Sequence, residues 1–141
     1  MKKLLAVAAM VFGLVSATAA SAAVIEARVN ISAQQMHVYQ NGVHRYTWPV
    51  STARGGKVTP VGTWTAKWTS KNHKSSRYRG APMPYSIFYS GNYAVHGTNQ
   101  IKNLGRPASA GCIRLHPDNA RVLYDMALRA GLANTKIVVT R

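Results

Sequence analysis

Two short segments carry the strongest signal in this chain of 141 residues: Val95-His96-Gly97-Thr98 and Ser109-Ala110-Gly111-Cys112-Ile113-Arg114-Leu115. They place His96 sixteen residues before Cys112, with each residue at the end of a predicted strand. Strand ends can meet across a sheet, so this spacing allows the imidazole and the thiol to lie together. A neighbouring imidazole can take the proton of a thiol and lower the thiol pKa by several units. The pattern therefore predicts a cysteine nucleophile served by a histidine base.

Residues next to the cysteine fit the same chemistry. Gly111 leaves room for a substrate backbone, and backbone N–H groups there can point at a developing oxyanion. If the segment is extended, Arg114 shares a face with Cys112, where its guanidinium could bind a carboxylate or support the oxyanion. Two structural alternatives stay open. Cys112 could be a buried core cysteine, and Ser109 could merely shape the turn.

Alternation of apolar and polar residues predicts a mostly β fold around these segments. Asn41-Gly42 between two alternating runs is a strong hairpin signal. We expect strands at 24–30, 36–39, 43–48, 63–69, 85–89, 93–95 and 136–140, loops at 51–60 and 71–84, and a turn at 90–92.

One helix is predicted, from Pro117 to about Ala130. Proline suits the first helical position, and Asp118 in the first turn favours the helix dipole. Gly131 supplies the C-terminal stop. The apolar face consists of Val122, Leu123, Met126, Ala127 and Ala130.

The charge balance excludes several kinds of site. The chain has 18 Lys and Arg against 3 acids, and no carboxylate side chain lies between Arg28 and Pro117. That stretch can form neither a paired-carboxylate glycosidase site nor a magnesium or calcium site. A zinc site is not expected either, because the chain has one cysteine and its other histidines lack ligand spacing. We therefore expect no metal and no cofactor, and a His96 that is oriented by something other than an acid.

The N-terminus is typical of a secretory signal peptide at residues 1–22. Lys2 and Lys3 precede an apolar run at 4–15, and Ala20-Ser21-Ala22 is a small-x-small cleavage signal. Removal of these 22 residues would leave one domain, 23–141, with 16 cations and 3 anions. That domain has no apolar stretch long enough for a membrane helix. The expected location is the periplasm or cell envelope, which argues against a nucleic-acid partner.

The two opening segments together resemble the signature of the L,D-transpeptidase (YkuD-type) catalytic domain. The resemblance extends upstream, so it covers nearly all of residues 23–141. The matching parts are the hairpin at 36–51, Thr59-Pro60-Val61-Gly62-Thr63-Trp64, and the run 83–96 into the histidine. One departure is Ala110, where the family often has histidine. We expect this change to affect substrate positioning and not catalysis itself.

The resemblance implies a YkuD-like β-sandwich or barrel and a cysteine acyltransferase of the bacterial cell wall. Cys112 would attack the carbonyl between the third residue and D-Ala of a peptidoglycan tetrapeptide stem, and an amine would resolve the thioester. His96 would act as base and then acid, oriented by the backbone carbonyl of Gly97. The residues expected at the substrate or the oxyanion are Arg114, Gly111, Ser109, Thr98 and Tyr85, although Tyr85 also fits strand packing.

The acyl acceptor stays open between a second stem, an amine of an outer-membrane protein, a D-amino acid and water. Two alternative functions also remain. A sortase-like transpeptidase uses the same three residue types, but its spacing differs from that found here. A non-catalytic basic protein that binds the cell wall would account for the charge alone.

Overall fold

The computed structural model describes residues 8, 10, 13, 14, 16 and 24–141. Most of the predicted signal peptide, residues 1–22, falls outside these residues, and its cleavage signal does so entirely. Among the described residues, no helix is both long and apolar enough to cross a membrane.

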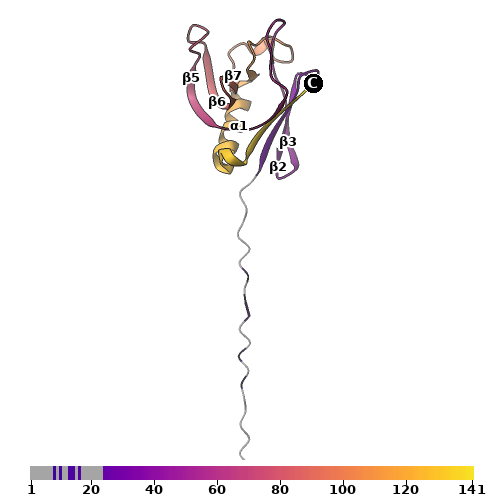
Figure 1. The fold of residues 1–141 in the computed structure, drawn as a ribbon, viewed down its shortest axis with the longest axis vertical. Helices are drawn as coiled ribbons and strands as arrows, with labels where there is room; N and C mark the ends of the chain where they lie inside the picture. Colours follow the sequence, from indigo (N-terminus) through magenta and orange to yellow (C-terminus); the bar gives the residue numbers. More distant parts are fainter. Residues whose placement is uncertain (1–7, 9, 11–12, 15, 17–23) are drawn as a thin grey trace, which may run out of the picture.

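Two sheets make up most of the fold, which confirms the predicted mostly β class (Figure 1). The first sheet has the order β3-β2-β1-β9-β4. Its strands are β1 (Ile25–Asn30), β2 (Gln35–Gln40), β3 (Val43–Pro49), β4 (Gly62–Thr65) and β9 (Thr135–Thr140). β1 pairs antiparallel with β2 and parallel with β9, so the last strand of the chain lies beside the first.

The second sheet has the order β5-β6-β7-β8. Its strands are β5 (Trp68–Lys74), β6 (Pro82–Ser90), β7 (Tyr93–Gly97) and β8 (Ile113–Leu115). β7 and β8 are parallel, and the connection between them contains the short 3-10 helix η1 (Ile101–Asn103). Isolated bridges tie the segment that leaves the first sheet to this region of the second: one joins Ser51 to Arg114 of β8, and the other joins Ala53 to Ser109 of the connection.

The helix α1 (Pro117–Ala130) forms as predicted and packs against β6 and β7. The His116 ring accepts a hydrogen bond from the backbone N–H of Asp118 at 3.1 Å, and Gly131 ends the helix with a φ of 89°. The buried face is rotated from the predicted one: Val122 and Met126 are only partly buried. The buried face observed in α1 consists of Ala120, Leu123, Tyr124, Ala127 and Ala130.

The strand predicted at 63–69 is wrong as a single element, because the chain changes sheets in its middle. The backbone N–H of Ala66 donates to Thr135 in the first sheet at 2.8 Å. The next N–H, of Lys67, donates to Phe88 in the second sheet at 2.9 Å. The result is two strands, β4 and β5, with a two-residue break between them.

The loop predicted at 71–84 is also wrong for most of its length, because β5 and β6 extend into it as a hairpin (upper left in Figure 1). Its polar residues and prolines suggested irregular structure. Pro82 and Pro84 pair only with β5, since the pairing of β6 with β7 begins at Ile87. Proline is tolerated there as in an edge strand.

The core lies between the two sheets and α1, and β9 supplies its centre. Ile137 is fully buried in the middle of this strand, whereas its neighbour Val138 points to the other face and is only partly buried.

We predict that Ile137→Ala lowers the free energy of unfolding by about 3 kcal/mol, because it removes three buried carbons and leaves a cavity. Val138→Ala is the matched control and should cost about 1 kcal/mol or less. Urea unfolding of both variants measures the difference, and equal losses would contradict this picture of the core.

Candidate active site

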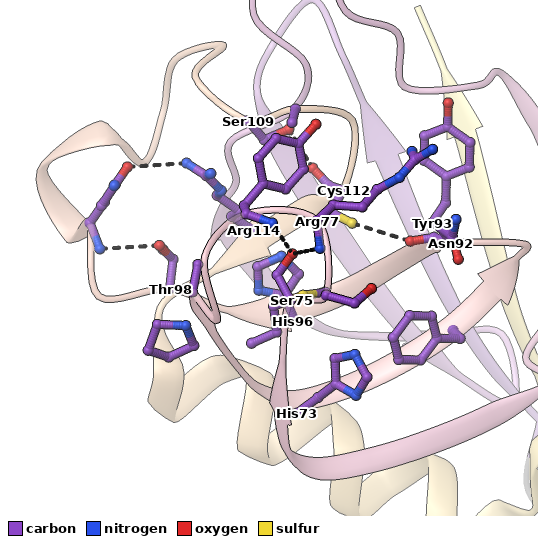
Figure 2. A pocket seen from close by; sticks show the side chains of 18 of the residues that line it. His73, Ser75, Arg77, Asn92, Tyr93, His96, Thr98, Ser109, Cys112 and Arg114 are labelled. Carbon is purple, nitrogen blue, oxygen red and sulfur yellow. Dashed lines mark hydrogen bonds between the residues drawn. The ribbon is translucent and has the colours of Figure 1, made fainter.

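A cavity of about 490 Å³ lies at the end of the second sheet. Its walls come from the β5–β6 hairpin, β7, the connection into β8, and the segment after β3. Both His96 and Cys112 line it, together with Arg114 (Figure 2). The two segments that stood out in the sequence therefore form one site.

The parallel register of β7 and β8 brings these residues together. His96 pairs directly with Arg114, and Val95 pairs with Ile113. Side chains alternate along a strand, so His96 and Arg114 share one face, while Val95 and Ile113 are buried in the core on the other. Cys112 comes immediately before β8, two residues from Arg114 and on the side of the cavity.

The His96 ring is buried, with 5% of its surface exposed. Its Nδ1 lies 2.6 Å from the backbone carbonyl oxygen of Gly97. A carbonyl can only accept a hydrogen bond, so Nδ1 carries the proton and Nε2 keeps the free lone pair. Burial lowers the pKa of His96 to about 4, with a smaller lowering by the charge of Arg114 and an opposing effect of the Gly97 bond. Near neutral pH the ring is thus a neutral base.

Cys112 is half-buried, and its thiol contacts a backbone carbonyl. Sγ lies 3.7 Å from the backbone carbonyl oxygen of Asn92, to which the S–H can donate (Figure 2). Burial raises the pKa of the thiol, against the opposing effects of a backbone hydrogen bond from Ala94 and of the Arg114 charge. Burial thus acts against the lowered thiol pKa expected from the sequence, because it favours the uncharged form of both groups.

Arg114 is half-buried and extends along the cavity wall. Its Nη1 donates to Oε1 of Gln100 at 3.2 Å. Burial lowers the pKa of Arg114, and the nearby charge of Arg54 acts in the same direction while Cys112 opposes it. The guanidinium remains charged, and its hydrogen-bond partner is neutral.

The turn before Cys112 is held by buried hydrogen bonds. The Ser109 hydroxyl donates to the Cys112 carbonyl at 2.6 Å and accepts from the Gly111 N–H at 3.0 Å. The Thr59 hydroxyl donates to the Gly111 carbonyl at 2.8 Å. Ser109 therefore shapes the turn, and the Gly111 N–H would have to leave Ser109 before it could serve an oxyanion.

Glycine at position 111 is required by its surroundings. Its φ is 137°, and a Cβ atom there would lie 2.7 Å from Cε1 of Tyr93. Any side chain at this position would collide with the Tyr93 ring and strain the backbone beside Cys112.

The remaining predicted site residues divide between the cavity and the core. Thr98 and Ala110 line the cavity, and Thr98 accepts a hydrogen bond from the Gln100 N–H at 3.1 Å. Tyr85 is not among the lining residues. It packs edge-on against Tyr124 of α1 at a centroid distance of 5.5 Å, which is the packing role that the sequence left open.

Most of the other residues that line the cavity were not predicted as site residues, among them Arg54, His73, Arg77 and Asn92. His73 and Arg77 belong to the hairpin that was predicted as a loop, and Asn92 was assigned only to a turn. The Thr-Pro-x-Gly segment contains Thr59 and could have indicated a role for this residue near the site. The contact of Thr59 with Gly111 is visible only in the fold. Within the described part of the chain, no three His, Cys, Asp or Glu side chains gather closely enough to hold a metal ion.

The comparisons with known proteins agree on one family. The model of the YkuD L,D-transpeptidase catalytic domain matches residues 25–139. The chain is 27% identical to the "Probable L,D-transpeptidase YbiS" of Escherichia coli (strain K12), over 69% of this chain and 40% of that protein. It is 27% identical to the "Probable L,D-transpeptidase ErfK/SrfK" of the same organism, over 69% of this chain and 39% of that one.

The fold is similar to solved structures as well. A structure of an L,D-transpeptidase from Mycobacterium smegmatis superposes with a TM-score of 0.75 at 26% identity, covering 84% of this chain and 59% of that one. The chain thus spans about two fifths of these curated relatives and about three fifths of the solved structure.

The protonation states of the site predict how the thiol reacts. We expect iodoacetamide to label Cys112 slowly at pH 7, because the raised pKa keeps the thiol neutral. The labelling rate should rise with pH, and the pH at which it is half-maximal should be higher than for a model thiol. His96→Gln should keep the same midpoint, since the ring it replaces is uncharged in that range. A labelling plateau that extends below pH 8 in the wild type but not in the variant would instead reveal a thiolate–imidazolium pair.

The low pKa of His96 also predicts a loss of stability in acid. The unfolded imidazole takes up a proton near pH 6.5, whereas the folded one resists protonation until about pH 4. Stability contributed by the neutral ring is therefore present above pH 6.5 and falls by up to about 3 kcal/mol as the pH drops to 4. Denaturant unfolding from pH 7 to 4 should show this loss in the wild type but not in His96→Gln. The control His44→Gln, which removes an exposed imidazole on β3, should keep the wild-type slope.

Proposed function

The chain belongs to the family of L,D-transpeptidase catalytic domains, and from this membership we propose that it transfers acyl groups from peptidoglycan tetrapeptide stems through Cys112. The observation that carries the proposal is the register of β7 and β8. It places a buried neutral histidine and a half-buried arginine in the same cavity as the only cysteine of the chain. We take residues 23–141 as the catalytic domain.

Acylation begins with a neutral thiol and a neutral imidazole. The thiol turns from its weak contact with the Asn92 carbonyl, and Nε2 of His96 takes its proton as Sγ attacks the carbonyl carbon between the third residue and D-Ala. The hydrogen bond between Nδ1 and Gly97 holds the ring in the required tautomer. The protonated His96 then gives its proton to the nitrogen of the leaving D-Ala, and a thioester remains on Cys112.

An amine completes the reaction. His96 takes a proton from the attacking nitrogen, the new amide bond forms, and the sulfur leaves and is reprotonated. The acceptor is an amine of a second stem, of an outer-membrane protein or of a D-amino acid, whereas water would give hydrolysis.

Charge stabilisation during both steps is assigned to Arg114. It lies on the same face of the sheet as His96, and among the described residues its half-buried guanidinium bonds to the neutral side chain of Gln100. A positive charge in a partly desolvated site stabilises an oxyanion more strongly than one in water. The predicted signal peptide supports action in the periplasm, where the stems are found.

The central experiment is mass spectrometry of muropeptides after incubation with purified tetrapeptide stems, which separates cross-linking, exchange and hydrolysis in one measurement. Cys112→Ala should abolish D-Ala release, because the nucleophile is gone. His96→Gln should reduce it by a factor of about 10² or more. Circular dichroism confirms that both variants are folded. D-Ala release by Cys112→Ala at the wild-type rate would refute the mechanism, and a folded wild type that releases no D-Ala would refute the proposed function.

A further inference from the structure

The cavity is lined by arginines and by no carboxylate. Arg54, Arg77 and Arg114 all contribute to its walls. The three acidic side chains of the chain lie elsewhere. Glu26 pairs with Arg28 at 2.7 Å, Asp118 lies 3.7 Å from His116, and Asp125 lies 4.0 Å from Arg121. Among the described residues, no acidic side chain therefore lines the cavity to neutralise its positive charge.

Arg54 is held beside the catalytic turn by its backbone. Its N–H donates to the Ser109 carbonyl at 2.9 Å, next to the bridge between Ala53 and Ser109. Its charge lies close enough to Arg114 to lower the pKa of that guanidinium, after the larger effect of burial. Both guanidinium groups line the same cavity, so an anion bound there would be stabilised by both charges.

Arg77 approaches the cavity from a different segment. It lies in the turn at 75–81 of the β5–β6 hairpin, where its backbone N–H donates to the Ser75 hydroxyl at 3.2 Å. Arg54, Arg77 and Arg114 thus come from three separate parts of the chain and face one space. Their side chains make no ion pair in the part of the chain that the structure describes.

We infer that Arg54 is a specificity-determining residue that binds a free carboxylate of the donor peptide outside the scissile bond, while Arg114 serves the reacting centre. The inference rests on the proposed function. A guanidinium matches a carboxylate with two parallel hydrogen bonds, whereas a primary amide offers one acceptor and no charge. The enzyme would therefore select donor stems whose carboxylates are free over stems whose carboxylates are amidated, and Arg77 adds to this selection from the hairpin side.

The test uses two synthetic tetrapeptide donors that differ only in these groups. In one, the carboxyl groups that take no part in the peptide backbone bonds of the donor are free, and in the other they are primary amides. The rate of D-Ala release gives kcat/KM for each. We expect the wild type to prefer the free acid by about 10-fold or more, a preference that arises in KM and weakens as salt rises.

Arg54→Gln should remove most of this preference, and Arg54→Lys, which keeps the charge, should restore part of it. Arg45→Gln is the matched control. Arg45 is an exposed arginine on β3 that contacts Gln40 outside the cavity, so the wild-type ratio should persist. A merely structural role of Arg54 would lower the turnover of both donors equally and leave the ratio intact, which would overturn the inference.

Binding to the Cys112→Ala variant separates this inference from the proposed function. Calorimetry of the two peptides with that variant measures selection without turnover. Tighter binding of the free acid that is lost when Arg54→Gln is added would support the inference. This holds even if neither peptide releases D-Ala in the wild type, because absence of release would refute only the proposed function. Equal affinities would refute the selection and leave acyl transfer standing.

Discussion

The parallel pairing of β7 with β8 is the constraint on which the site depends. β8 has three residues, so it could not hold its place alone. Ile113 and Leu115 anchor it in the core, and backbone hydrogen bonds between Ser51 and Arg114, at 2.9 and 3.1 Å, tie it to the segment that follows β3. Because Arg114 is fixed opposite His96, the sulfur two residues earlier is confined to the same cavity. If β8 were shifted by one residue, the side chains of Arg114 and Cys112 would turn toward the core.

Burial sets the electrostatics of this site. None of the three acidic residues of the chain is a hydrogen-bond partner of His96 in the described structure, and the Gly97 carbonyl orients the ring instead. A carboxylate would have stabilised the imidazolium, whereas a neutral carbonyl in a buried setting leaves the ring uncharged. Burial therefore favours the neutral forms of both the Cys112 thiol and the His96 ring. An uncharged thiol is consistent with the contact to the Asn92 carbonyl, and the charged side chains that line the cavity are those of Arg54, Arg77 and Arg114.

The differences between the expected and the observed elements have local causes. The pattern at 63–69 is continuous, yet Ala66 and Lys67 bond to different sheets, and no sequence signal marks a strand that changes partners. The segment 71–84 is polar because much of it is exposed on a hairpin that projects from the body. Its prolines are compatible with strand structure because β6 has no second partner there. From the sequence, Tyr85 could lie either in the core or in the cavity. In the fold it packs against Tyr124 in the core.

The sequence by itself determined the residue types of the site, the mostly β class and the helix from Pro117 to Ala130, because motifs, alternation and helix ends are local properties of the chain. Only the tertiary structure decided the protonation of Cys112 and His96, because burial is produced by residues distant in sequence. It likewise decided the thiol contact with Asn92, twenty residues away, and the position of Arg54 beside Ser109. Such contacts depend on which strands pair and in which register, and residue spacing does not specify either.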